Sequence, residues 1–169
     1  MPDLKMKNID GWMLSYADIK GAKGTVVAFW CNHCPFVKKA RLRFIELANT
    51  YQSEGIAFLA VNSNTPKKFE GDSFENMQKI AEQFGYPFPF VVDEGSRLAL
   101  AMGGARTPHI FLFDAADKLV YVGAIDDAPG KPDEIENDWL KDAMDDLLEG
   151  RPVRTSRSKA FGCSIKFYK

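Results

Sequence analysis

The chain has 169 residues, and its 22 Lys and Arg against 23 Asp and Glu give a formal net charge of −1. That length suits one globular domain, because domains run to about 100–200 residues. The 46% hydrophobic content excludes a disordered chain, and the near-zero charge argues against a dedicated nucleic-acid binder. No apolar run approaches the ~20 residues that a membrane helix needs.

The first five residues, Met-Pro-Asp-Leu-Lys, lack the apolar segment of a secretory signal peptide. We therefore expect a cytoplasmic protein if the sequence is full length, with no membrane partner. The three cysteines are too few for a disulfide scaffold. Cys31 and Cys34 form a C-x-x-C pair and Cys163 lies near the other end, a distribution that favours reactive chemistry over structural bridging.

Alternation of apolar runs and periodic segments predicts the elements of the first half. A β-prone run over 25–30 predicts a buried strand, and the helical periodicity of 35–53 predicts a helix that stops at Gly55. A second strand is expected over 56–61. Ser73 is expected to cap a helix through 84, closed by Gly85.

Prolines within 86–93 favour an extended approach to a strand, followed by a short helix over 96–102. The runs 109–113 and 119–123 are joined so briefly that they predict an antiparallel hairpin. A loop over 126–133 leads to a final helix, capped by Asn137 and reaching Leu148, with Gly150 after it.

These elements predict an α/β fold, with a central mixed β-sheet flanked by helices on both faces. We expect one domain over 1–150 and a basic tail over 151–169. Acidic residues dominate 133–149, so the tail is expected to pack near the last helix. A nucleic-acid or anionic-membrane patch and a solvated tail are the alternatives. The basic tail residues are Arg151, Arg154, Arg157, Lys159, Lys166 and Lys169.

The C-x-x-C pair lies where the first long helix follows the first strand. Helix N-termini favour anions, so we expect the pKa of Cys31 to fall. Cys34 lies on the inward stripe, which makes Cys31 the exposed nucleophile and Cys34 the shielded partner that resolves the mixed disulfide. Pro35 suits the first helical turn. His33 either stabilises the Cys31 thiolate when protonated or only solvates the start of the helix.

A bound metal or an inert thiol pair is the alternative reading of the motif. A structural zinc site takes four N or S ligands, and the sequence offers only His109 and Cys163 as distant candidates. We therefore expect no metal and no organic cofactor. A Cu(I) or Zn carrier using the two cysteines and His109 is the non-enzymatic alternative.

From residue 8 to 150 the sequence resembles the thioredoxin-fold thiol–disulfide oxidoreductases, in the alkyl hydroperoxide reductase/thiol-specific antioxidant (peroxiredoxin-like, ResA/TlpA-like) branch. The resemblance rests on the run 26–35, on Thr107-Pro108 and on the hairpin that follows. It implies a thioredoxin fold, a cis Pro108 facing the C-x-x-C and a Thr107 backbone that pairs with an extended substrate. The stretch 62–104 resembles the insertion of the peroxiredoxin-like branch.

Two departures from the family patterns matter. Aligning the peroxidatic motif P-x-x-x-T-x-x-C on Cys34 places Cys31 at the Thr position and Val27 at the Pro position. A thiol thus replaces the peroxide-orienting hydroxyl, which favours dithiol exchange. The buried acid that thioredoxins keep is absent from the first strand, so proton transfer must use water, His33 or a group from elsewhere.

Several neighbouring residues are expected to shape the site: Trp30, Asn32, His33, Pro35, Arg106, Thr107 and Pro108. Trp30 either shields the disulfide or only packs. Arg106 either supports the Cys31 thiolate or faces solvent, and His109 is a core or sheet-edge residue or a proton shuttle. Cys163 is a possible third redox thiol that crosslinks to Cys31 or Cys34, or else a bystander.

We therefore predict a thiol–disulfide oxidoreductase, with a peroxiredoxin-like antioxidant thiol peroxidase as the second enzymatic hypothesis. The expected partners are a protein dithiol or disulfide, or a small thiol or peroxide, together with a dithiol electron donor. The chain is expected to be a monomer or weak dimer.

Overall fold

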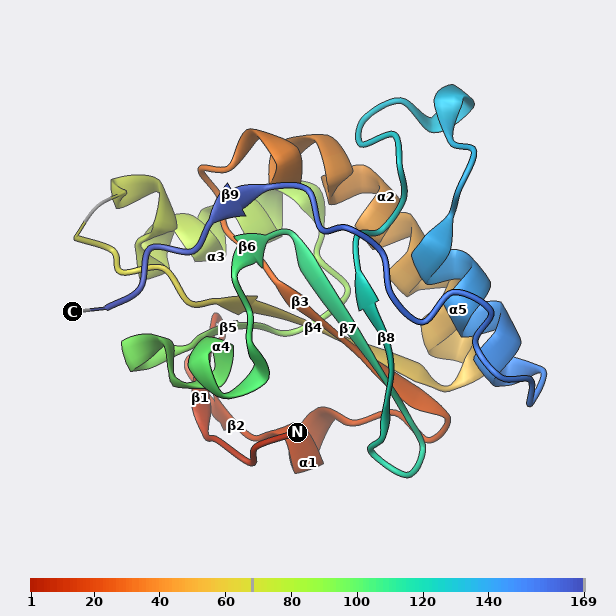
Figure 1. Cartoon of the computed structure of the whole chain (residues 1–169). Coiled ribbons are helices and arrows are strands. Elements are labelled where there is room, and N and C mark those ends of the chain that lie inside the picture. The colour runs from red at the N-terminus through yellow and green to blue at the C-terminus, as the bar shows by residue number, and fades with distance from the viewer. Residues whose placement is uncertain (68, 169) are drawn as a thin grey trace.

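The computed structural model describes residues 1–67 and 69–168, and a seven-stranded mixed sheet forms its centre (Figure 1). The strand order is β2-β1-β5-β4-β3-β7-β8, in which β3, β4 and β5 are parallel and the other pairings antiparallel. A second sheet pairs β6 with β9. The strands are β1 (Met6–Asn8), β2 (Met13–Leu14), β3 (Gly24–Phe29), β4 (Ile56–Asn62), β5 (Phe90–Val92), β6 (Arg106–Thr107), β7 (His109–Asp114), β8 (Leu119–Gly123) and β9 (Cys163–Ser164).

Helices cover both faces of the sheet, which confirms the predicted mixed α/β architecture. Side chains of α2, α3 and α5 join one hydrophobic cluster, and those of α1 and α4 join the other. The helices are α1 (Tyr16–Ile19), α2 (Pro35–Tyr51), α3 (Phe74–Phe84), α4 (Arg97–Met102) and α5 (Trp139–Leu148). Short 3-10 turns span Gln52–Glu54, Glu70–Asp72, Glu94–Ser96 and Pro132–Glu134.

The helix that carries the C-x-x-C follows its predicted pattern. Pro35 is its first residue, where a missing N–H costs little, and the predicted inward stripe is buried. A 3-10 turn then leads to Gly55, whose φ of 94° ends the segment in a left-handed conformation. The helix α2 thus begins just after the carboxyl end of β3, with its apolar stripe buried.

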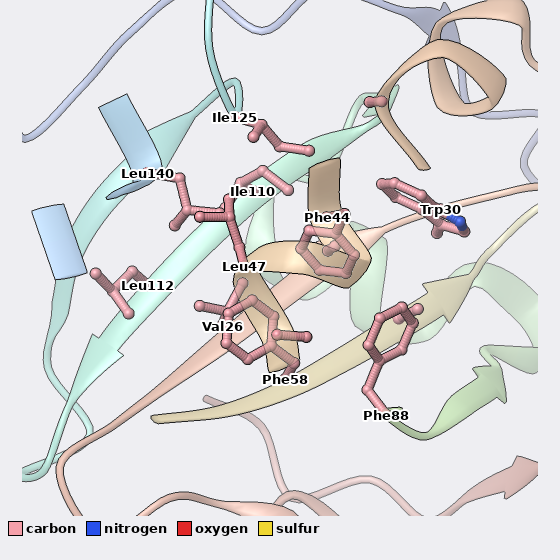
Figure 2. Close-up of a cluster of buried hydrophobic side chains, with 14 of the residues drawn as sticks. Val26, Trp30, Phe44, Leu47, Phe58, Phe88, Ile110, Leu112, Ile125 and Leu140 are labelled. Atoms are coloured by element: carbon pink, nitrogen blue, oxygen red, sulfur yellow. The ribbon is translucent and has the colours of Figure 1, made fainter. Parts of the chain in front are cut away.

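Aromatic side chains pack around Phe44 beneath the start of α2. The ring of Phe44 lies 4.9 Å from Trp30, 5.4 Å from Phe58 and 5.1 Å from Phe88, measured between centroids. Figure 2 shows Phe44 among these three side chains. Because Trp30 directly precedes Cys31, the cluster holds the chain in place where the motif begins.

Two parts of the fold differ from the sequence prediction. β1, β2 and α1, which extend the sheet edge and one face, were not predicted. The expected cap at Asn137 was wrong: α5 begins at Trp139 with Asp138 at the N-cap position. Asn137 instead donates a side-chain hydrogen bond of 2.7 Å to Asp127, whose carboxylate also accepts the Asn137 backbone N–H.

The segment after α5 is held by a buried carboxylate. Asp146 is 1% exposed at its side chain and accepts hydrogen bonds from the Arg151 and Arg154 guanidinium groups, both at 2.9 Å. The Arg154 backbone N–H also donates to it, at 3.0 Å. The tail thus contacts the acidic helix, as its charge pattern predicted. Lys169 lies outside the described residues.

From this anchor the tail crosses the end of β8 and reaches β6, beside which β9 lies (Figure 1). Ser158 fixes the crossing, because its backbone N–H donates to Val122 and its hydroxyl accepts from the Ala124 N–H. Across the described residues, none of the helices combines the length and the apolar character that crossing a bilayer requires.

Replacing Asp146 with Asn should destabilise the protein near neutral pH. The Arg154 backbone N–H, followed by the two guanidinium groups, lowers the pKa of Asp146 from 3.8 to about 2. A depressed folded-state pKa stabilises the fold above the unfolded pKa, and this contribution is lost as pH falls through about 2. Urea unfolding of the original protein and of the Asp146→Asn variant should therefore show a difference in the free energy of unfolding that decreases below about pH 4. A difference independent of pH would contradict this.

Candidate active site

The sulfur atoms of the C-x-x-C both contact Thr107, one at its side-chain hydroxyl and the other at its backbone carbonyl. Cys31 Sγ lies 3.2 Å from Thr107 Oγ1, and Cys34 Sγ lies 3.1 Å from the Thr107 carbonyl oxygen. The Thr107–Pro108 peptide bond is cis, as the resemblance implied. Since Phe29 pairs with His109 in the sheet, the cis bond is placed beside the end of β3. Both cysteines, Thr107 and Pro108 are thus brought together.

Neither thiol of the pair is exposed. Cys31 and Cys34 both have 0% exposure, whereas Cys163 is partly exposed. The prediction of an exposed Cys31 beside a shielded Cys34 was therefore wrong. The tail segment around Cys163 lies against the motif and contributes to this cover, which local helical periodicity could not reveal.

The predicted low pKa of Cys31 was also wrong. α2 starts at Pro35, so Cys34 occupies the N-cap position and Cys31 precedes the helix. Hydrogen bonding with Cys34 raises the pKa of Cys31 well above its ordinary value, and burial and the Asp72 charge act in the same direction. The same hydrogen bond from Cys31 lowers the pKa of Cys34 to about 4, assisted by donors from Cys163 and the Val37 backbone. The first negative charge of the pair thus lies on Cys34.

A buried carboxylate that sequence reasoning missed lies beside the motif. The Asp72 side chain is 0% exposed. It accepts the backbone N–H groups of Asn32 at 2.7 Å and His33 at 3.3 Å, and it lies 2.5 Å from His33 Nδ1. The Phe69 ring stacks on His33 with 3.9 Å between centroids. Asp72 is thus a buried acid beside the motif, and no local signal in the sequence separated it from a helix-flanking acid.

Cys31, His33 and Asp72 form a group whose ligand atoms all lie within 4.8 Å of one another. This set offers three donors, one fewer than a structural zinc site takes. The Asp72 oxygens are already occupied by the two backbone N–H groups and the His33 ring. The arrangement therefore fits hydrogen bonding better than metal binding.

The other predicted residues have mostly structural contacts. Trp30 is fully buried and donates from Nε1 to the Tyr86 hydroxyl at 3.2 Å, so it packs. Asn32 donates from its amide to the Gly71 carbonyl at 3.0 Å. Arg106 is exposed and donates to the Gly162 carbonyl at 3.0 Å, so it holds the tail.

His109 is a sheet residue in the structure. Its ring lies 4.6 Å from that of Phe111, and its Nδ1 accepts the Ala105 N–H at 3.4 Å. Burial, followed by the charges of Arg106 and Arg157, lowers the pKa of His109 to about 4. A neutral imidazole held in this way favours the reading of His109 as a core or sheet-edge residue over that of a proton shuttle.

Cys163 reaches the site from the other end of the chain. Its sulfur lies 2.8 Å from that of Cys34, and Cys163 pairs with Thr107 in the β6–β9 register. Burial, and then the hydrogen bond with Cys34, raises the pKa of Cys163 to about 11. The Cys34 and Cys163 sulfurs are in contact but not bonded, so the predicted crosslink stays a prediction.

Comparisons with known proteins agree with this geometry. The AhpC/TSA family model matches residues 1–122. The thiol-disulfide oxidoreductase ResA of Geobacillus thermodenitrificans is 32% identical over 118 residues, which cover 70% of this chain and 63% of the relative, less than two thirds of its length.

Among solved structures, an uncharacterized conserved protein from Geobacillus kaustophilus is similar over 99% of this chain and 89% of its own, with 41% identity and a TM-score of 0.93. The exposed lipoprotein thioredoxin of Streptococcus pneumoniae is 22% identical over 72% of this chain and 87% of its own, with a TM-score of 0.58. The likeness to the latter confirms the thioredoxin fold.

Replacing Thr107 with Val should raise the pKa of Cys31 further, because the Thr107 hydroxyl bond lowers it. A hydrogen bond to a charged group contributes about 1.5–3 kcal/mol, which corresponds to a roughly tenfold or larger loss of thiolate at fixed pH. Ultraviolet absorbance of the thiolate measures this in a Cys34→Ser/Cys163→Ser background. Thr107→Ser, which keeps the hydroxyl, is the control. Equal titration of the Val variant and its parent would refute the role of the hydroxyl.

Proposed function

Because the chain belongs to the AhpC/TSA family, we propose that it is a thiol–disulfide oxidoreductase whose Cys31 and Cys34 reduce a disulfide of a protein or small-molecule substrate. The observation that carries this proposal is the meeting of both sulfur atoms at Thr107, beside the cis peptide bond. The ResA likeness supports the same reaction class. An electron donor with a dithiol would return the pair to its reduced state.

The proposed reaction begins with the proton that the two thiols share. With both thiols protonated, the Cys34 S–H donates to the Thr107 carbonyl. When the pair ionises, the hydrogen bond from Cys31 favours the thiolate on Cys34. As the Cys31 sulfur attacks the substrate disulfide, its proton moves to Cys34, one substrate sulfur leaves as a thiolate, and a mixed disulfide forms. The Cys34 thiolate thus acts as the base for the first step.

The second step closes the cycle. The departing substrate thiolate takes the proton from Cys34, whose low pKa favours its return to the thiolate. Cys34 then attacks Cys31, the second substrate thiolate leaves and is protonated by water, and a Cys31–Cys34 disulfide remains. One substrate disulfide is reduced and one dithiol is oxidised, so electrons balance.

A peroxiredoxin-like peroxidase is the competing function. The low pKa of Cys34 supports peroxide attack, because thiolates are the reactive species. Against it, the peroxide-orienting hydroxyl of the family motif is replaced by the Cys31 thiol. Stopped-flow oxidation by hydrogen peroxide and by a disulfide distinguishes the two. The antioxidant role and the cytoplasmic location stay predictions.

Single cysteine replacements, made in a Cys163→Ser background, should separate the two steps. Cys34→Ser keeps the Cys31 nucleophile but lacks both the base and the resolving thiol, so it should form a mixed disulfide with half of an added disulfide such as oxidised glutathione slowly and then keep it. Cys31→Ser should accumulate much less adduct, and neither variant should turn over with dithiothreitol as donor. Intact mass under non-reducing conditions measures the adduct. Turnover that survives both replacements would sink the proposal.

A further inference from the structure

We propose that residues 162–165 of the tail occupy the active site as a built-in substrate strand, and that Cys163 is a third redox residue that exchanges with Cys34. This inference rests on the proposed function, because the exchange needs a Cys31–Cys34 disulfide to act on. It assigns a chemical role to the part of the chain that covers the motif.

The tail is docked by backbone pairing at the edge where the sulfurs lie. Thr107 pairs with Cys163 and Arg106 with Ser164, and the Ile165 N–H donates to the Ala105 carbonyl at 3.0 Å. An extended segment added to an exposed edge is a general mode of peptide recognition. Since both catalytic sulfurs contact Thr107, a strand paired there carries a side chain to the C-x-x-C, and in this chain that side chain is a thiol.

Gly162 shows that the close approach is built into the sequence. Its φ is +151°, and a Cβ at this position would lie 2.1 Å from the Thr107 carbonyl oxygen and 3.2 Å from the Pro108 nitrogen. No side chain fits in that space without displacing the strand. Arg106 adds a hydrogen bond to the Gly162 carbonyl from the same edge.

The residues beyond Cys163 anchor the strand from the opposite side. Ile165 is 4% exposed and packs in the hydrophobic cluster of β3, β4 and α4. The Lys166 N–H donates to the buried Asn64 at 2.7 Å, and the Lys166 carbonyl accepts the Thr65 N–H at 2.8 Å. Anchors on both sides of Cys163 distinguish a fitted segment from a solvated tail.

The two sulfurs are placed to exchange. A disulfide bond is about 2.05 Å long, so the 2.8 Å between Cys34 and Cys163 closes with an approach of roughly 0.8 Å. In the proposed step, the Cys163 thiol loses its proton to water and attacks Cys34 in the Cys31–Cys34 disulfide. The Cys34–Cys163 bond forms as the Cys31–Cys34 bond breaks, and Cys31 leaves as a thiolate that takes a proton from water.

The charge on Cys34 makes the attack by Cys163 depend on whether Cys34 is reduced or oxidised. In the reduced protein the Cys34 thiolate raises the pKa of Cys163, after burial as the first cause. When Cys34 is part of a disulfide that negative charge is gone, so Cys163 ionises more readily. Cys163 therefore becomes a better nucleophile at the stage when a disulfide is available for it to attack.

Occupation of this edge has a consequence for access. Cys31 and Cys34 have no exposed surface while the strand is docked, so a substrate disulfide must displace the tail to reach them. The Cys34–Cys163 bond would keep the strand docked until a donor thiol reduces it. The tail thus competes with substrates for the Thr107 edge, and the competition is redox-dependent.

The test compares three variants that each keep two cysteines: Cys31→Ser, Cys34→Ser and Cys163→Ser. After equilibration in a glutathione redox buffer, peptide mapping measures each intramolecular disulfide. Cys31→Ser should form the Cys34–Cys163 crosslink at least tenfold more favourably than Cys34→Ser forms Cys31–Cys163, because only Cys34 contacts Cys163. Equal crosslinking in these two variants overturns the inference. Failure of Cys163→Ser to form Cys31–Cys34 overturns the proposed function instead.

A Gly162→Ala change in the Cys31→Ser protein tests the docking itself. Overpacking against Thr107 should lower formation of the Cys34–Cys163 disulfide about tenfold, while Gly11→Ala should not. Gly11 is the matched control, since its φ is +91° and no heavy atom would lie within 4 Å of its added Cβ. Far-ultraviolet circular dichroism confirms that both variants are folded. A folded Gly162→Ala protein that crosslinks like its parent overturns the inference.

Discussion

The site depends on Thr107, a residue of the short strand β6 that contacts the segments bearing the three cysteines. One residue offers its hydroxyl to Cys31, its carbonyl to Cys34 and its place in the strand register to Cys163. The adjacent cis peptide bond places this edge beside the end of β3, where α2 begins. Without that edge the C-x-x-C would be a pair of thiols at a helix start, with no surface on which a substrate strand could align.

The second organising feature is the distribution of charge around three thiols. Cys34 lies at the start of α2 and receives donors from Cys31, Cys163 and the backbone, whereas Asp72 adds negative charge on the side of Cys31. One anion is thus favoured, and it is shared by hydrogen bonding within a buried site, where such bonds are strong. When the reduced pair ionises, a base on Cys34 lies beside the protonated Cys31, which is the arrangement that the proposed first step uses.

Local pattern predicted the parts of this site that depend on local physics. The apolar run before Trp30, the stripe on α2 and Gly55 placed the C-x-x-C between β3 and α2, and the structure agrees. Asp72 comes from a segment distant from the motif, so no periodicity marks its contribution. The strands β1 and β2 are too short, at 3 and 2 residues, to show an alternating pattern. The predictions of an exposed Cys31 and of a low Cys31 pKa were wrong because both properties depend on Cys34, Asp72 and the covering tail, which the local pattern does not describe.

The tail joins the structural and chemical arguments. Its basic residues indicated contact with the acidic helix, and Asp146 provides that contact by pairing with Arg151 and Arg154. This contact fixes where the tail starts, but it does not require Gly162 to lie against Thr107 or a thiol to face Cys34. A tail selected only for packing would still need the glycine at 162, but it would accept many residues at 163. Gly162 is explained by the backbone contact with Thr107, and the exchange proposed above accounts for a thiol at the next position, where it contacts Cys34.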